Sequence, residues 1–200
     1  MYDVLIIGGG VSGMQCALIL GSALKKPYAK EKKVGIILHQ KASHLQTALF
    51  NNVLGLEKEK RGSDILSFGK TQLQENYPEV EIITSEKVIS IDEITNGFVV
   101  NTNKNKYYTR IGVIALNYAK PFTISGLENY LEPHKKSPKS KDRIQLKNTD
   151  HLVQKNLYVC GTLAGHPSQF AIAAGSGASV ATDILTLWNN GIFTKVHDKI

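Results

Sequence analysis

The sequence predicts an α/β fold in which a parallel sheet is flanked by helices and extended by an antiparallel β-meander. An apolar run at residues 2–7 meets a glycine-rich turn and then a helix built of small residues. A second, fully apolar run at residues 34–38 is typical of a buried parallel strand. Closely spaced strands joined by polar turns between residues 86 and 109 indicate the meander.

The turn after the first strand carries the spacing G-x-G-x-x-G at Gly8, Gly10 and Gly13. In this strand–turn–helix context the first glycine permits a tight turn, the second lets the backbone approach a pyrophosphate, and the third allows close packing of helix on strand. The helix start at Val11 and Ser12 offers free N–H groups and a positive dipole end to phosphates. The motif predicts a dinucleotide site, and a tight turn without a ligand is the alternative.

The first half of the chain continues this pattern. The first helix is expected to extend to about residue 24, and together with the strands at 2–7 and 34–38 it forms a right-handed βαβ unit. Residues 41–61 are expected to be irregular and polar. A capped helix is then predicted from Ser63 to about residue 76.

The second half of the chain is dominated by strands. Residues 134–147 hold six basic residues and one acid, a composition that is typical of a linker. After the last strand come a loop with His166 and a small-residue helix over about 169–188. The expected strands span residues 80–83, 86–91, 97–102, 106–109, 110–116 and 157–161.

Composition limits the function classes and the compartment. Much of the formal net charge of +7 lies in lysine clusters at 25–33 and 135–147, which lack the interleaved aromatic residues of single-strand nucleic-acid sites. We interpret them as solvated surface and expect no nucleic-acid partner. No apolar segment of about 20 residues stands out as a membrane span, so no membrane partner is expected either. Two cysteines without a C-x-x-C motif suggest a reducing compartment, so the expected localisation is cytoplasmic.

Several signals occur here in the order found in one family. They are the glycine turn, the meander, the strand 113–116 ahead of Lys120-Pro121, the run Gly126-Leu127-Glu128, and the strand ending at Gly161 before an alanine-rich helix. The chain resembles the FAD domain of thioredoxin-reductase-like pyridine nucleotide–disulfide oxidoreductases, and it is most similar to single-domain flavoproteins related to thioredoxin reductase. The resemblance implies one Rossmann-like FAD/NAD(P)-binding domain over residues 1–200.

The resemblance also implies that only half of the two-domain enzyme is present. In that enzyme an NADPH domain with its own glycine motif and a redox C-x-x-C precedes the final strand. Here the gap holds only residues 130–147, and neither motif occurs. FAD is then the expected cofactor, with electrons supplied by free NAD(P)H or by an electron-transfer partner protein. A second copy could cover the apolar surface left by the missing domain, so a homodimer is one expectation.

Carried over residue by residue, the resemblance places the pyrophosphate on the glycine turn. Val88 would contact the adenine through its backbone, and Asn52 would face the flavin. Gly161 and Thr162 stand where the family has Gly-Asp. The next helix would point its positive end at the pyrimidine part of the flavin and stabilise negative charge there. The residues expected at that helix start are Gln169, Phe170 and Ala171.

Three departures from the family pattern concern hydrogen bonds to the sugars. The acid expected after the second strand is replaced by His39, with Gln40 next. The family's Ala-Thr-Gly is replaced by residues 115–117, which end in Asn117, and its Gly-Asp ends here in Thr162. The replacing groups still form hydrogen bonds to hydroxyls, so we expect weaker binding rather than none. Because the acid is missing and lysines are near, NADP, whose 2′-phosphate needs a basic partner, remains an alternative dinucleotide.

No residue qualifies as an indispensable catalytic group, and the sequence shows no metal-ligand spacing. Cys16 and Cys160 are either core residues or reactive thiols. His166 is either an exposed loop residue or a proton donor to the flavin. We predict a flavoprotein oxidoreductase in which the flavin performs the redox chemistry. A non-enzymatic FAD-binding regulatory or interaction protein and an NADP-binding module are the alternatives.

Overall fold

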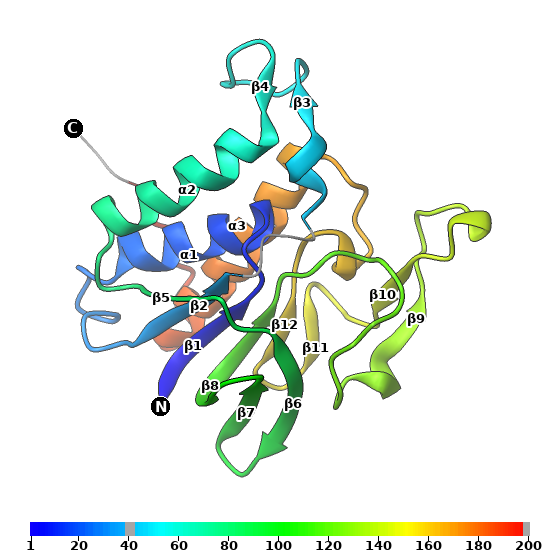
Figure 1. Cartoon of the computed structure of the whole chain (residues 1–200). Coiled ribbons are helices and arrows are strands. Elements are labelled where there is room, and N and C mark those ends of the chain that lie inside the picture. The colour runs from blue at the N-terminus through cyan, green and yellow to red at the C-terminus, as the bar shows by residue number, and fades with distance from the viewer. Residues whose placement is uncertain (39–42, 198–200) are drawn as a thin grey trace.

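The computed structural model describes residues 1–38 and 43–197 and has a mixed α/β architecture (Figure 1). Parallel pairing at the centre of the sheet confirms the predicted fold class. β1 (Tyr2–Ile7) lies between β2 (Val34–Leu38) and β8 (Lys106–Ile114), and all three are parallel. β5 (Glu81–Thr84) extends the sheet beyond β2, and β12 (Leu157–Val159) extends it beyond β8.

The predicted meander is present, but its last strand is longer than the sequence suggests. β6 (Val88–Ile94) and β7 (Gly97–Thr102) are antiparallel, and β7 pairs in turn with β8. The expected strands 106–109 and 110–116 are one strand, β8. Thr109 marks the change of partner, because it pairs with Phe98 of β7 and with Tyr2 of β1. The hydrophobic pattern changes there because one strand passes from a half-exposed hairpin into the buried sheet.

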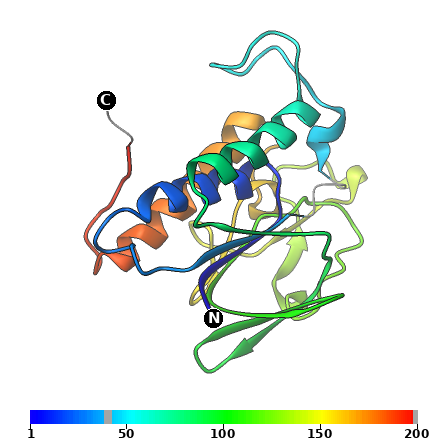
Figure 2. The same cartoon turned by 60° about the vertical axis from the view of Figure 1, so that its left-hand side comes forward.

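Helices cover one face of the sheet and the meander covers the other (Figure 2). The helices are α1 (Val11–Ala23), α2 (Gly62–Asn76) and α3 (Phe170–Trp188). Side chains alternate between the faces of a strand, so Val4 and Ile6 of β1 join the helix-side core. Leu5 and Ile7 join the core on the meander side.

α3 is long and apolar enough to cross a membrane by length and composition alone. This property differs from the expectation that no segment could span a membrane, because glycine, serine and threonine are interspersed among the apolar residues of this helix. In this structure α3 packs along α1, and Val180, Ile184 and Leu185 are fully buried in the helix-side core. α3 therefore serves here as a core helix of the α/β fold.

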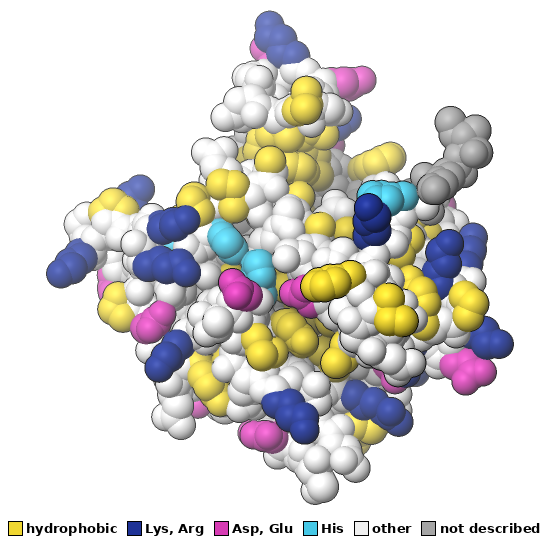
Figure 3. All heavy atoms as spheres, turned by 180° about the vertical axis from the view of Figure 1, so that it is seen from behind, with side chains coloured by type: hydrophobic (Ala, Val, Ile, Leu, Met, Phe, Trp, Pro, Cys, Tyr) yellow, Lys and Arg dark blue, Asp and Glu magenta, His cyan; other side chains and the backbone are white. Residues whose placement is uncertain are grey.

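The segment 134–147, expected as a linker, contains ordered structure. β9 (Leu131–Pro133) and β10 (Ile144–Leu146) form an antiparallel pair, with a short 3-10 helix at Lys139–Lys141 between them. Ile144 and Leu146 are buried in the meander-side core, which fixes the segment to the fold. The segment was predicted to be a linker because its composition is mostly basic, and the two buried apolar residues Ile144 and Leu146 do not stand out in it. Lysine and arginine side chains are scattered over the rear face in Figure 3.

The remaining elements are short. Residues 41–61 were expected to be irregular, and their described part contains one 3-10 turn and two short strands that pair with each other. Another strand pairs with β12 at the edge of the sheet. These elements are the strands β3 (Leu49–Phe50), β4 (Lys60–Arg61) and β11 (Leu152–Gln154), and the 3-10 helices His44–Thr47, Glu128–Tyr130 and Gly161–Ala164.

Candidate functional site

A cavity of about 500 Å³ opens at the carboxyl ends of β1, β8 and β12. Ligands of open α/β sheets bind at this edge, and the volume lies within the range of small-molecule sites. The glycine turn after β1 forms one side, and residues 115–124 after β8 form another. Residues 43–50 and the start of α3 complete the lining.

The three glycines of the turn are needed for different structural reasons. Gly8 has φ +118, and a Cβ there would lie 2.2 Å from the Ala115 carbonyl oxygen. A Cβ on Gly13 would lie 2.0 Å from the Gly8 carbonyl oxygen. At Gly10, in contrast, the nearest atom to an added Cβ is 3.9 Å away, on Ser43. Gly8 and Gly13 are therefore required by packing, whereas Gly10 leaves open backbone at the cavity.

The N-terminus of α1 is suited to an anion. Gly10 is its N-cap residue and supplies no side-chain hydrogen bond. The first N–H groups of a helix have no partner within the helix and carry the positive end of its dipole. With no capping side chain in the way, the first turn of α1 can donate hydrogen bonds to a phosphate group.

The turn after β12 packs tightly against the start of α1. Gly161 has φ +74, and a Cβ on it would lie 2.6 Å from Ser12 Oγ. A Cβ on Gly177 of α3 would lie 2.0 Å from the Ser12 carbonyl oxygen. This close approach brings Thr162 and the N-terminus of α3 to the same cavity as the glycine turn.

The structure brings most of the predicted site residues together around the cavity. Gly13 lies behind the turn, Asn52 is exposed in the β3–β4 loop, and Ala171 is exposed on α3, so these three do not line it. His39 and Gln40 lie outside the described residues. The predicted residues that line the cavity are Gly8, Gly10, Val11, Ser12, Val88, Asn117, Gly161, Thr162, Gln169 and Phe170.

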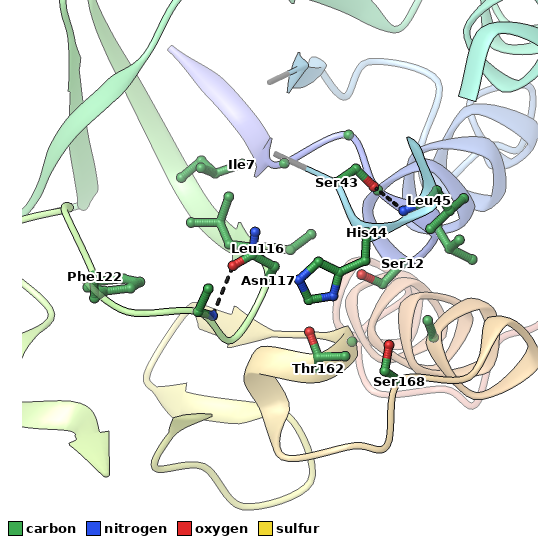
Figure 4. A pocket seen from close by; sticks show the side chains of 18 of the residues that line it. Ile7, Ser12, Ser43, His44, Leu45, Leu116, Asn117, Phe122, Thr162 and Ser168 are labelled. Atoms are coloured by element: carbon green, nitrogen blue, oxygen red, sulfur yellow. Dashed lines mark hydrogen bonds between the residues drawn. The ribbon is translucent and has the colours of Figure 1, made fainter. Parts of the chain in front are cut away.

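Sequence reasoning missed the part of the lining that precedes α2. Ser43, His44 and Phe50 line the cavity, and His44 points into it (Figure 4). Burial lowers the pKa of His44, and the positive charge of Arg143 lowers it further, so this imidazole is neutral near pH 7. Nothing in the spacing of residues 41–61 indicates this role, because the segment has no hydrophobic periodicity.

The cavity has an apolar end and a polar end. Ile7, Leu116 and Phe122 lie at one end. The hydroxyl groups of Ser12, Ser43, Thr162 and Ser168 lie toward the other end, where His44 and Leu45 also line the cavity (Figure 4). The glycine turn lies between these two groups. A long ligand with a central pyrophosphate, one apolar planar group and one polar planar group suits this arrangement.

The thiols and His166 lie outside the cavity lining. Cys16 and Cys160 are free and fully buried. Burial raises the pKa of both thiols, that of Cys160 to about 12, so neither forms the thiolate that reactive cysteines need. His166 instead contacts His151, with 3.1 Å between their Nε2 atoms. In this structure His166 is half-buried against His151 rather than part of the cavity lining, so its role as a proton donor to a flavin stays a hypothesis.

Comparison with known proteins identifies the family to which the chain is similar. Residues 2–166 match the family model of pyridine nucleotide-disulphide oxidoreductases. The protein CzcO of Bacillus subtilis, described as an uncharacterized oxidoreductase, is 25% identical over 195 residues, covering 92% of this chain and 52% of CzcO. The chain thus spans about half the length of this curated relative.

Solved structures with a similar fold include several reductases. A thioredoxin reductase from Gloeobacter violaceus aligns with TM-score 0.71 and 15% identity, over 100% of this chain and 98% of its own. An oxidoreductase from Agrobacterium tumefaciens gives TM-score 0.70 and 12% identity, over 93% and 98%. A ferredoxin-flavin thioredoxin reductase from Clostridium acetobutylicum gives TM-score 0.68 and 16% identity, over 94% and 98%. At these identities the likeness establishes the fold alone.

Proposed function

This chain belongs to the pyridine nucleotide-disulphide oxidoreductase family, and from that premise we propose that it binds FAD in the cavity and acts as a flavoprotein oxidoreductase. The observation that carries the proposal is the start of α1, where open backbone at Gly10 meets a helix N-terminus without a capping side chain. This arrangement fits the pyrophosphate of a dinucleotide.

The expected roles of the other cavity residues follow from placing the pyrophosphate at the start of α1. The apolar end, which includes Ile37, Val88 and Ile124, would hold the adenine. The polar end would hold the flavin, with the Thr162 side chain placed for a hydrogen bond to a hydroxyl group, and Asn117 also lines the cavity. When bound, FAD supplies the electron-accepting ring, and the chain binds it, orients it and excludes water.

The N-terminus of α3 supplies the main electrostatic effect at the polar end. Gln169 is the N-cap residue of α3 and makes no side-chain capping hydrogen bond, and Gln169 and Phe170 both line the cavity. The positive helix end would favour negative charge on the nearby part of the ligand. This arrangement is expected to make the bound flavin easier to reduce.

The electron donor is proposed to come from outside the chain. The 200 residues hold no second glycine motif and no C-x-x-C pair. We propose free NAD(P)H or a partner protein as the donor. Leu49 and Ile172, which are adjacent in sequence to the cavity-lining Phe50 and Ala173, are exposed apolar side chains on which such a donor, or a second copy of the chain, could dock.

A second candidate is a FAD-binding protein without dithiol chemistry or enzymatic turnover. The buried, protonated states of Cys16 and Cys160 favour it, because neither thiol is available to exchange with a disulfide. An NADP-binding module is the third candidate, and it differs from the others in its ligand.

The visible spectrum of the purified full chain tests the proposal. A yellow protein, or a colourless one that takes up added FAD in preference to NADP, is expected. Protein that takes up no FAD would refute the proposal. Anaerobic mixing of the flavin-loaded protein with NADH or NADPH then tests free NAD(P)H as the donor. Bleaching of the flavin supports an oxidoreductase that takes electrons from free NAD(P)H. Flavin that stays oxidised with both excludes that donor and leaves a partner-protein donor or the non-enzymatic candidate.

A further inference from the structure

The turn after β12 is held from behind by side chains that do not line the cavity. The backbone N–H of Gly161 donates to Ser176 Oγ over 2.8 Å. Ser176 Oγ lies 3.0 Å from His151 Nε2, which lies 3.1 Å from His166 Nε2. These three side chains, here called the histidine network, connect the cavity-lining Gly161 to a pair of imidazoles.

The network lies where a small displacement would reach the proposed cofactor site. Ser176 is buried on α3, and its neighbour Gly177 packs against the Ser12 carbonyl of the glycine turn. Gly161 packs against Ser12 Oγ and adopts a left-handed conformation that few other residues accept. If Gly161 lost its bond to Ser176, the turn could shift relative to the start of α1, and Thr162 would move with it.

Other bonds hold the rest of this turn. His134 Nε2 lies 3.0 Å from the Thr162 carbonyl oxygen, and Asn148 Nδ2 donates to the Ala164 carbonyl over 3.3 Å. Asn148 also accepts a bond from the backbone N–H of His151 over 3.2 Å. Among these contacts, the bond through Ser176 joins the turn to the imidazole of His151, whereas Asn148 joins the turn to the backbone of His151.

The hydrogen bond between the imidazoles depends on how many protons the pair holds. In the neutral pair one Nε2 carries a proton and the other accepts it. One added proton still allows an N–H···N bond. Two added protons place an N–H on both Nε2 atoms and two positive charges 3.1 Å apart. The doubly protonated pair must therefore separate.

Both histidines are neutral at pH 7 for physical reasons visible in their surroundings. Burial lowers the pKa of His151, which Asp150 raises and Lys135 lowers. Burial also lowers the pKa of His166, and nearby cations lower it further. Figure 3 shows two neighbouring histidine side chains on the rear face, with acidic side chains next to them and basic side chains to one side. The charged and titratable groups that act on the pair are Asp150, Lys135, Lys136 and His134, and burial together with Asp150 raises the pKa of the nearby Asp183.

We propose that Ser176, His151 and His166 are positioning residues that hold the Gly161–Thr162 turn in its cofactor-binding conformation, and that protonation of the histidine pair releases this turn. The inference rests on the proposed binding of FAD. Its consequence is a flavin site that is tight near neutral pH and loosens in acid, although the histidine network does not touch the ligand.

The test measures the FAD dissociation constant of the full chain between about pH 8 and pH 5.5. Wild-type affinity is expected to stay constant above about pH 7 and to weaken by about tenfold or more at pH 5.5, as linkage to protonation requires. His166→Gln keeps a side chain that can hydrogen-bond to His151 but cannot gain a proton, so its dissociation constant should change much less between pH 8 and pH 5.5 than that of the wild type. His197→Gln is the matched control, because His197 is exposed, and it should follow the wild-type profile.

A second variant tests the connection to the turn. Ser176→Ala leaves the Gly161 N–H without its partner, so it should weaken binding about tenfold even at pH 8, an effect of the size expected for a lost buried hydrogen bond. Thermal unfolding without FAD, at pH 8 and pH 5.5, shows whether each variant is folded. If Ser176→Ala does not fold, the profile of His166→Gln decides the question.

Three outcomes would overturn the inference. The wild-type dissociation constant could be independent of pH, His166→Gln could keep the full acid effect, or the effect could disappear only in His134→Gln, which acts through the Thr162 carbonyl. These outcomes all require FAD to bind near pH 8. Absence of flavin binding at every pH is a different result, and it would refute the proposed function itself.

Discussion

Replacing Gly10 by valine is expected to abolish tight cofactor binding without unfolding the protein. The backbone at Gly10 has φ −76 and ψ −175, an extended conformation open to any residue, and an added Cβ meets no protein atom closer than 3.9 Å. A poorer N-cap costs about 1 kcal/mol, and the reduced freedom of the unfolded chain returns about 0.4–1 kcal/mol. Stability should therefore change little.

The effect of Gly10→Val on cofactor binding should be larger than its effect on stability, because the valine side chain would occupy the space expected for the pyrophosphate. A hydrogen bond to a charged group contributes about 1.5–3 kcal/mol. Loss of one such bond weakens the dissociation constant by about 10- to 150-fold. Flavin fluorescence during titration measures this constant, and thermal unfolding without FAD measures stability.

Gly13→Ala is the matched contrast, since its Cβ would lie 2.0 Å from the Gly8 carbonyl oxygen. Overpacking of this kind costs about 1–3 kcal/mol, so this variant should lose stability as well as binding. Wild-type affinity in Gly10→Val would show that the pyrophosphate lies elsewhere. A melting temperature lowered by more than about 8 °C in Gly10→Val would contradict the packing argument.

Further predictions concern the core, a buried carboxylate and the thiols. Leu20→Ala removes a fully buried side chain and should cost about 2–5 kcal/mol in chemical denaturation, whereas Leu187→Ala, half exposed on α3, should stay within about 0.5 kcal/mol. Burial raises the pKa of Glu86, but three side-chain hydrogen bonds lower it more, so the net pKa is depressed. A depressed folded-state pKa stabilises the protein above the ordinary carboxyl pKa of 4.5, and this stability is lost as pH falls through the folded value. Glu86→Gln should therefore be less stable at neutral pH and lose less stability on acidification, and equal slopes of stability against pH in both proteins would contradict this. Cys16 and Cys160 should resist a thiol-specific reagent in the native protein and react after denaturation, and rapid native labelling would show that they are accessible.

The features that sequence predicted well are those fixed by local patterns. The apolar runs at 2–7 and 34–38 can be buried only in a sheet covered on both faces, and the glycine spacing at 8–13 needs a strand before it and a helix after it. The order of elements followed from these patterns and from the family resemblance. The residues around the cavity from the glycine turn, β12 and α3 were found for the same reason.

The features that sequence missed depend on contacts between distant segments. The continuity of β8 is set by its change of partner at Thr109, which no local pattern reveals. His44 reaches the cavity from a segment without periodicity, and Ile144 anchors a segment that composition describes as basic. His151 and His166 are single histidines in the sequence, and they form a pair only because β11 and the loop after β12 are neighbours.

The close approach of Gly177 to Ser12 has a consequence for how the protein is made. The glycine turn at residues 8–13 is synthesised well before α3, the last of the described helices, which packs behind it. A nascent chain lacking α3 exposes the apolar flank of α1, where unfolded segments tend to aggregate. Binding of the proposed cofactor would therefore have to follow the synthesis of α3. A chain truncated before residue 170 is expected to be insoluble and, under the proposed function, flavin-free.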